Sequence, residues 1–121
     1  MVKILTQPIT IADFTHAKKI TVTTRHHSSI SDTTRVITNE YRIKRVKVPN
    51  EPEWHLNLET KLSYIYKDDM GRIIKRGASK WRKNTSRIHT IESILSDMNS
   101  KIKLYNKLKN NPYADVVKLY E

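Results

Sequence analysis

The sequence has no cysteine, only two glycines and no apolar run of membrane-spanning length. The lack of cysteine excludes disulfides and thiolate chemistry, which is consistent with a reducing compartment. Glycine at positions 71 and 77 alone cannot build a glycine-rich phosphate loop. Pro8 and Asp13 interrupt any signal-peptide pattern at the N-terminus, and the sequence predicts no membrane partner. The length of 121 residues predicts one domain, residues 1–121.

Acidic residues are also scarce, with 12 against 23 lysines and arginines and a net charge of +11. The basic residues are spread along the chain, so folded surfaces must carry them. Such an excess favours a polyanionic partner: nucleic acid, an acidic protein or anionic lipid. Solubility alone is the alternative explanation.

The clearest pattern is an alternation along Trp54–Tyr66, which predicts a half-buried β-strand. The large apolar positions of this strand are Trp54, Leu56, Leu58, Leu62, Tyr64 and Tyr66. The polar positions between them are His55, Asn57, Glu59, Lys61 and Ser63. We expect the apolar side to join a core and the polar side to carry the function.

Two earlier stretches predict the neighbouring strands. Lys19–Arg25 alternates between aliphatic and polar residues. Arg35–Val48 alternates too, but its apolar residues change parity, which predicts a one-residue bulge near Lys44–Arg45. Two prolines between residues 49 and 52 end that strand, so we expect it to pair in antiparallel fashion with the strand from Trp54.

The ends of this strand region are less regular. Val2–Ile11 fits either a strand broken by Pro8 or a helical turn capped at Thr10–Asp13, and the sequence leaves both open. After the long strand, Lys67–Gly71 predicts a turn and Arg72–Lys75 a returning strand.

Apolar residues recur every three to four positions from Ile88 to Leu108 and predict an amphipathic helix. Asn84, Thr85 and Ser86 are its candidate N-caps. Pro112 is placed as the first residue of a second short helix. The sequence thus predicts an α+β fold, an antiparallel meander followed by two C-terminal helices. Two helices cannot cover such long apolar rows, so we expect a dimer whose subunits lend helices to each other.

Catalytic chemistry finds little support, and we expect no enzyme and no cofactor. The five histidines show no metal-ligand spacing. His55 and Glu59 on one strand face keep a small ribonuclease open as an alternative. Arg72–Arg87 is rich in basic residues around Trp81, which suits nucleic-acid stacking or a solvated arm anchored by the ring.

Three motifs in order resemble the coat protein of single-stranded RNA bacteriophages. They are KITVTTRHHSS at Lys19–Ser29, YRIKRVKVP at Tyr41–Pro49, and HLNLE at His55–Glu59. The second motif has one residue more than the family's strand, at the expected bulge. The long helix followed by Asn-Pro and a short apolar stretch is similar as well. Lys67–Asn84 reads as a hairpin added to the family pattern.

The resemblance implies an intertwined homodimer with one continuous sheet and helices packed across the partner. It implies an icosahedral shell of many dimers, assembled in the bacterial host cytoplasm and found in the virion. The inner sheet face of such proteins binds genomic RNA, including a stem-loop whose binding represses translation. The implied partners are therefore further copies of the chain and single-stranded RNA.

The polar strand faces and the resemblance together predict the RNA-binding residues. These are Thr21, Thr23, Arg25, Arg42, Lys44, His55, Asn57 and Glu59. By resemblance, Thr21 and Thr23 line an adenine pocket. Lys44 matches the pocket lysine, with Arg42 at a neighbouring position, and His55 replaces a stacking tyrosine.

A different class of function stays open beside the coat protein. A small basic DNA- or RNA-binding regulator of a phage or mobile element would use Lys67–Ser100, a hairpin followed by a helix, as its core. Particle size separates the two hypotheses, because a regulator stays small and a coat protein forms shells.

Overall fold

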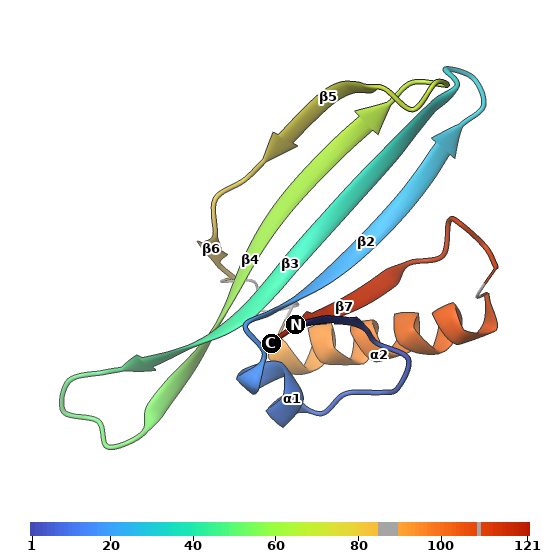
Figure 1. Ribbon diagram of the computed structural model, residues 1–121. Coiled ribbons are helices and arrows are strands. Elements are labelled where there is room, and N and C mark those ends of the chain that lie inside the picture. Colours follow the sequence, from blue (N-terminus) through green and yellow to red (C-terminus); the bar gives the residue numbers. More distant parts are fainter. Residues whose placement is uncertain (85–89, 109) are drawn as a thin grey trace.

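The computed structural model describes residues 1–84, 90–108 and 110–121, which form one seven-stranded sheet and two helices (Figure 1). The strands are β1 (Val2–Ile4), β2 (Lys19–Ser28), β3 (Thr33–Lys47), β4 (Trp54–Lys67), β5 (Ile73–Ala78), β6 (Arg82–Lys83) and β7 (Val116–Tyr120). The helices are α1 (Ile11–His16) and α2 (Ile91–Lys107). The α+β class is confirmed.

The sheet is antiparallel, in the order β1-β7-β2-β3-β4-β5, and β6 pairs with β4 on the same edge as β5. The last strand of the chain therefore lies between the first two. β3 and β4 form the long central ribbon, and the helices lie near one end of β2 (Figure 1).

The second C-terminal helix predicted after Pro112 is wrong, because Val116–Tyr120 is the strand β7. Its residues alternate, with Val117 and Leu119 buried and Lys118 pointing to the other side of the sheet. β-branched residues at the start of this segment suit a strand that fills the gap between β1 and β2. The two helices thus come from opposite ends of the chain.

The N-terminus has a part of each alternative: the strand is only Val2–Ile4, and the helical turn capped at Thr10 follows as α1. The hydroxyl of Thr10 accepts a hydrogen bond from the Asp13 amide (3.2 Å), and the Asp13 carboxylate accepts one from the Thr10 amide (2.8 Å). The backbone hydrogen bond from Thr10 holds the pKa of Asp13 below its ordinary value. Such a capping box satisfies amides that a helix start leaves free.

Helix α2 begins later than the sequence predicts. Its N-cap is Thr90, whose hydroxyl accepts from the amide of Ser93 at 3.1 Å. The predicted caps Thr85 and Ser86, and Ile88 at the predicted helix start, lie outside the described residues. Asn84 ends the described segment before them and instead donates its backbone amide to Leu58, at 2.8 Å.

β3 and β4 pair without interruption from Thr34–Lys67 to Lys47–Trp54, so the bulge predicted near Lys44–Arg45 is wrong. Arg45 shares the side of the apolar row, and Val46 shares the polar side. This end of the ribbon extends beyond the helices (Figure 1). The core cluster of the described residues does not reach Arg45 and Val46, so no buried contact fixes which face their side chains take, and the change of parity needs no bulge.

The core forms where α1 and α2 cover one side of the sheet, called here the helical face. Fully buried Phe14, Met98 and Ile102 of the helices pack against Ile20 and Val22 of β2 and their neighbours on β7 and β4. Burial also raises the pKa of the Tyr41 hydroxyl, at the margin of this core. The opposite side of the sheet, called the open face, has no helix over it among the described residues.

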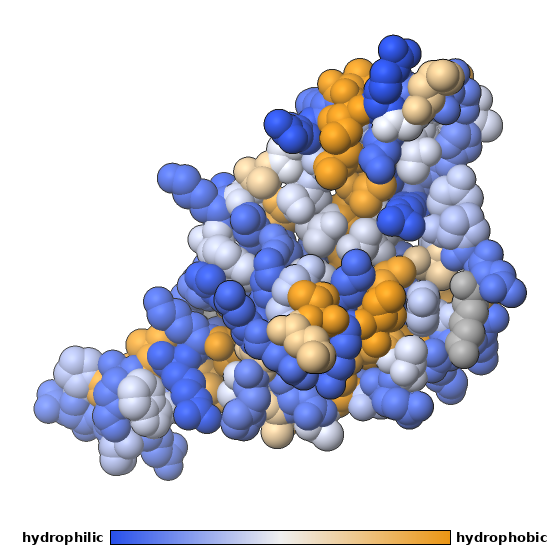
Figure 2. Space-filling model, in the orientation of Figure 1, coloured by the Kyte–Doolittle hydropathy of each residue, from blue (hydrophilic) through white to orange (hydrophobic). Residues whose placement is uncertain are grey.

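The helices cover only part of the helical face. The strands continue past the core residues Val22 and Leu58 as an arm, defined here as residues 24–37 and 62–78, that ends in the β2–β3 and β4–β5 turns (Figure 1). Apolar side chains are exposed along this arm as well as nearer the helices (Figure 2). Leu62, on the helical face of the arm, is 43% exposed.

Candidate nucleic-acid interface

The open face carries many more cations than carboxylates. Its residues follow from the strand register, because directly paired residues point to the same side of a sheet. Its cations are Lys19, Arg25, Arg42, Lys44, Lys61, Lys67, Arg76, Lys83 and Lys118. On the described strands, its carboxylates are Glu40 and Glu59. Both carboxylates are paired with cations, so the face as a whole is strongly positive.

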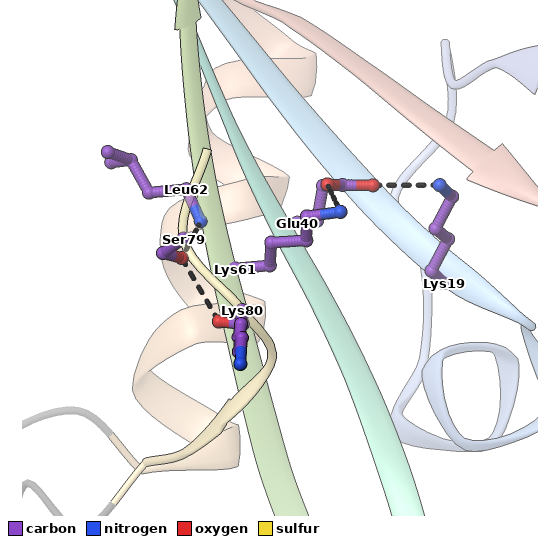
Figure 3. A network of polar contacts seen from close by, with 6 residues as sticks. All are labelled: Lys19, Glu40, Lys61, Leu62, Ser79 and Lys80. Atoms are coloured by element: carbon purple, nitrogen blue, oxygen red, sulfur yellow. Dashed lines mark hydrogen bonds and ion pairs between the residues drawn. The ribbon is translucent and has the colours of Figure 1, made fainter. Parts of the chain in front are cut away.

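Glu40 sits at the centre of this face in a row with Lys118, Thr21 and Lys61 on the neighbouring strands. Its carboxylate accepts a hydrogen bond from Lys19 at 2.7 Å and lies 3.9 Å from the Lys61 ammonium (Figure 3). Glu40 as a whole residue is 8% exposed, and Figure 3 shows α2 on the far side of the strands. Glu40 therefore links β2, β3 and β4. Its one negative charge is shared by two lysines, so the open face keeps a surplus of positive charge.

A second ion pair lies towards the β3–β4 turn. Arg42 donates to Glu59 at 2.7 Å, and its guanidinium lies 4.1 Å from the ring centre of Trp81. Lys83 of β6 is paired in register with Glu59. Glu59 is thus held as the partner of an arginine.

This geometry does not form the acid–base pair of a ribonuclease. His55 contacts the carboxylate of Glu51. Glu59 lies on the same strand as His55 but about 13 Å along it, at about 3.3 Å per residue. A general acid and base must both reach one reacting group, which this separation prevents.

The eight predicted residues do share one face, as the sequence predicts. Thr21, Thr23 and Arg25 pair with open-face residues of β3, and Arg42, Lys44 and His55 are on the same side of the β3–β4 ribbon. Asn57 and Glu59 pair with Lys44 and Arg42. The set divides into two groups, one on β2 and one on β3 and β4 near the β3–β4 turn.

The accessibility of these residues differs. Thr21 is only 3% exposed and offers little surface. Thr23 lies 3.4 Å from the hydroxyl of Thr38. Arg25 and Lys44 are exposed and, among the described residues, form no ion pair. Arg25 and Lys44 are therefore the cations of the predicted set that are most available to an anionic ligand.

Several cations of the face escaped the sequence reasoning. Lys118 was missed because its segment read as a helix. Lys83 and Arg76 were missed because the edge strands that present them are short and irregular. Lys61 had the right parity in the alternating strand, so the signal for it was present. Lys19 also alternates with aliphatic residues at the start of β2.

The described residues do not form a metal site or a membrane-spanning helix. Within ranges 1–84, 90–108 and 110–121, no three histidine or acidic side chains gather as a metal ion would require. Neither described helix has the length and apolar character needed to cross a membrane.

Comparisons of the chain with protein-family models, curated proteins and solved structures found no match.

Proposed function

We propose that this chain is the coat protein of an RNA phage, which binds single-stranded RNA on its open face and assembles from dimers. The observation that carries the proposal is the surplus of cations on a sheet face that the helices leave free. Cations on one surface neutralise phosphates and release counterions, which gives affinity for any RNA sequence. Hydroxyl and amide side chains such as Thr23 and Asn57 add hydrogen-bonding groups for unpaired bases.

The exposed helical face of the arm supports the assembly part of the proposal. Ile37, Leu62, Tyr64 and Tyr66 lie on one side of β3 and β4; Leu62 is exposed and the other three are half-buried. An apolar sheet surface of this kind costs free energy in water and marks an interaction site. A second copy of the chain is the partner we assign to it. Covering this surface leaves the open face free for RNA.

The RNA-binding part is tested with two double variants that remove the same charge. Arg25→Gln/Lys44→Gln changes the open face, and Lys103→Gln/Lys107→Gln changes exposed positions on α2. Affinity for oligouridylate is measured by fluorescence anisotropy over a range of salt concentrations. We expect the open-face variant to reduce the slope of log K against log salt by about 0.7 for each lost phosphate contact.

The α2 variant is expected to keep nearly the slope and affinity of the parent protein. An equal loss in both variants would mean that only net charge matters. A loss confined to the α2 variant would contradict the open-face assignment and favour the basic regulator.

The assembly part is tested by electron microscopy and light scattering of the purified protein. We expect closed particles or stable dimers, and RNA retained in a low-salt preparation. A monodisperse monomer at micromolar concentration would contradict the coat function, and RNA binding by such a monomer would support the regulator.

A further inference from the structure

The edge beside β4 changes parity through a bulge. Between the last β5–β4 pair and the first β6–β4 pair, the edge has residues 79–81 where β4 has only residues 61–62. One extra residue on one strand inverts which side the following residues face. Arg76 before the bulge and Lys83 after it therefore both point to the open face, although their numbers differ in parity.

The bulge also brings Trp81 to the open face. Trp81 precedes Lys83 by two positions, and its ring lies 4.1 Å from the guanidinium of Arg42, an open-face residue. The segment is fixed on both sides. The Ser79 amide donates to the Leu62 carbonyl at 2.8 Å on one side, and β6 pairs with β4 on the other.

The surroundings of the ring combine the two groups that hold a nucleotide. Trp81 is half-buried, and one side of the ring is covered by Arg42, which Glu59 orients at 2.7 Å. Lys80, Arg82 and Lys83 next to it are exposed. An aromatic ring among cations binds single strands because bases stack on the ring while the cations contact phosphates.

We propose that Trp81 is a base-stacking site for single-stranded RNA at the edge of the open face. An unpaired base stacks on the side of the ring turned away from Arg42, and Arg42 and Lys83 contact the flanking phosphates. The site rests on the proposed RNA binding and adds a stacking contact at the edge of the sheet, apart from the one that the resemblance gives to His55.

The test uses the intrinsic fluorescence of the ring. The chain has two tryptophans, so Trp54→Phe leaves Trp81 as the only tryptophan, whose emission is followed with excitation beyond the tyrosine absorption. This variant is titrated with oligouridylate and, separately, with inorganic polyphosphate, which has the charges without the bases. We expect saturable quenching with oligouridylate and little change with polyphosphate. Equal quenching by both would overturn base stacking.

A second measurement compares substitutions of the ring. Trp81→Leu is expected to weaken oligouridylate binding by about 5- to 150-fold, the range for losing one stacked base, while Trp81→Tyr keeps most of the affinity. Trp81→Leu removes no charge, so its salt slope should equal that of the parent. Lys83→Gln should lower the slope by about 0.7. Circular dichroism and thermal unfolding check that each variant is folded.

The outcomes separate this site from the proposed function. RNA binding with an unchanged Trp81 emission and full affinity in Trp81→Leu would overturn the stacking site and leave the open face in place. A parent protein that binds no oligouridylate would overturn both proposals.

Discussion

β4 passes through two regions that share one sequence pattern but differ in what covers them. Leu58 and Leu62 are the same residue type on the same strand and the same face. Leu58 is 5% exposed because it joins the core under the helices, whereas Leu62 in the arm is 43% exposed. The alternation of residues therefore fixes which way a side chain points, and the tertiary arrangement decides whether it is buried.

The two regions also differ in what they contribute: one stabilises the fold, and the other offers a surface for interaction. The covered region contains the helices and the buried cluster, so it supplies most of the hydrophobic stabilisation. The arm holds its strands by backbone pairing and presents apolar side chains to water. We infer that the covered region folds the chain and that the arm provides surface for a second copy.

The largest expected effect comes from truncating the two leucines. Leu58→Ala should lower the free energy of unfolding by about 2–5 kcal/mol, because it leaves a cavity in the core. Leu62→Ala should lower it by less than about 1 kcal/mol, because much of the side chain already contacts water. Urea unfolding at low protein concentration measures both changes in stability. Equal losses would contradict the claim that Leu58 is in the core and Leu62 is not.

The same pair sharpens the assembly proposal. If a second copy covers the arm, Leu62→Ala should weaken dimerisation, and its loss of stability should grow with protein concentration. A loss that does not depend on concentration would show that Leu62 contacts no partner copy.

A substitution within the arm tests how its edge is held. A Cβ on Gly77 would lie 2.7 Å from two ring carbons and from the hydroxyl oxygen of Tyr64. Gly77→Ala should therefore displace the ring and cost about 1–3 kcal/mol, as overpacking does. Gly71→Ala is the control, because Gly71 has open space but a φ of +78°. It should cost about 1 kcal/mol from backbone strain alone. Thermal unfolding compares them, and an unperturbed Gly77→Ala would contradict the Tyr64 contact.

Glu40 lies on the open face, on the opposite side of the sheet from Leu58 and Leu62. A substitution of Glu40 therefore tests the charge of the open face. Glu40→Gln removes the carboxylate that Lys19 and Lys61 share, and should lower the free energy of unfolding by about 1–2 kcal/mol. The same change adds net positive charge to the face, so oligouridylate should bind more tightly. Glu92→Gln on α2 changes the net charge equally at an exposed site and is the matched control.

The last prediction concerns the cap of α1 in the covered region. Thr10→Ala should cost about 0.5–2 kcal/mol, as the loss of an N-cap does. It should also raise the pKa of Asp13 part of the way towards its ordinary value, because the hydrogen bond of the Thr10 side chain is lost while the backbone amide at position 10 still donates to the carboxylate. The pKa of Asp13 is lower in the folded state than in the unfolded state. The stabilisation that the Asp13 carboxylate provides is therefore present above the unfolded pKa and is lost as the pH falls through the folded pKa. Titration by NMR measures the shift, and an unchanged Asp13 would contradict the capping box.

The sequence predicted the central ribbon well because alternation over many residues is a strong signal. It placed β4 from Trp54, its pairing with the preceding strand, and the shared side of the eight polar residues. It failed at β7, whose five residues are too few to separate strand from helix before the neighbouring strands are known. It also placed the bulge in β3, whereas the irregularities of register lie on the edge paired with β4, at Tyr66–Lys67 and between β5 and β6.

The candidate site was predictable only in part, for a related reason. Residues within one strand, such as Asn57 and Glu59, could be assigned to a side by parity alone. The contact between Arg42 and Trp81 joins β3 to an edge segment across β4, and it depends on the bulge in that edge. In the sequence, only the basic residues around Trp81 indicated a site at this edge.

The most direct test of the open-face proposal is photo-crosslinking to RNA that contains 4-thiouridine, followed by mass spectrometry of the peptides. We expect crosslinks in β2, β3 and β4 at open-face positions, and at Trp81 if the stacking site is correct. Crosslinks should be nearly absent from α2, which lies behind the sheet. Crosslinks concentrated in α2, with none in the open-face strands, would contradict the account.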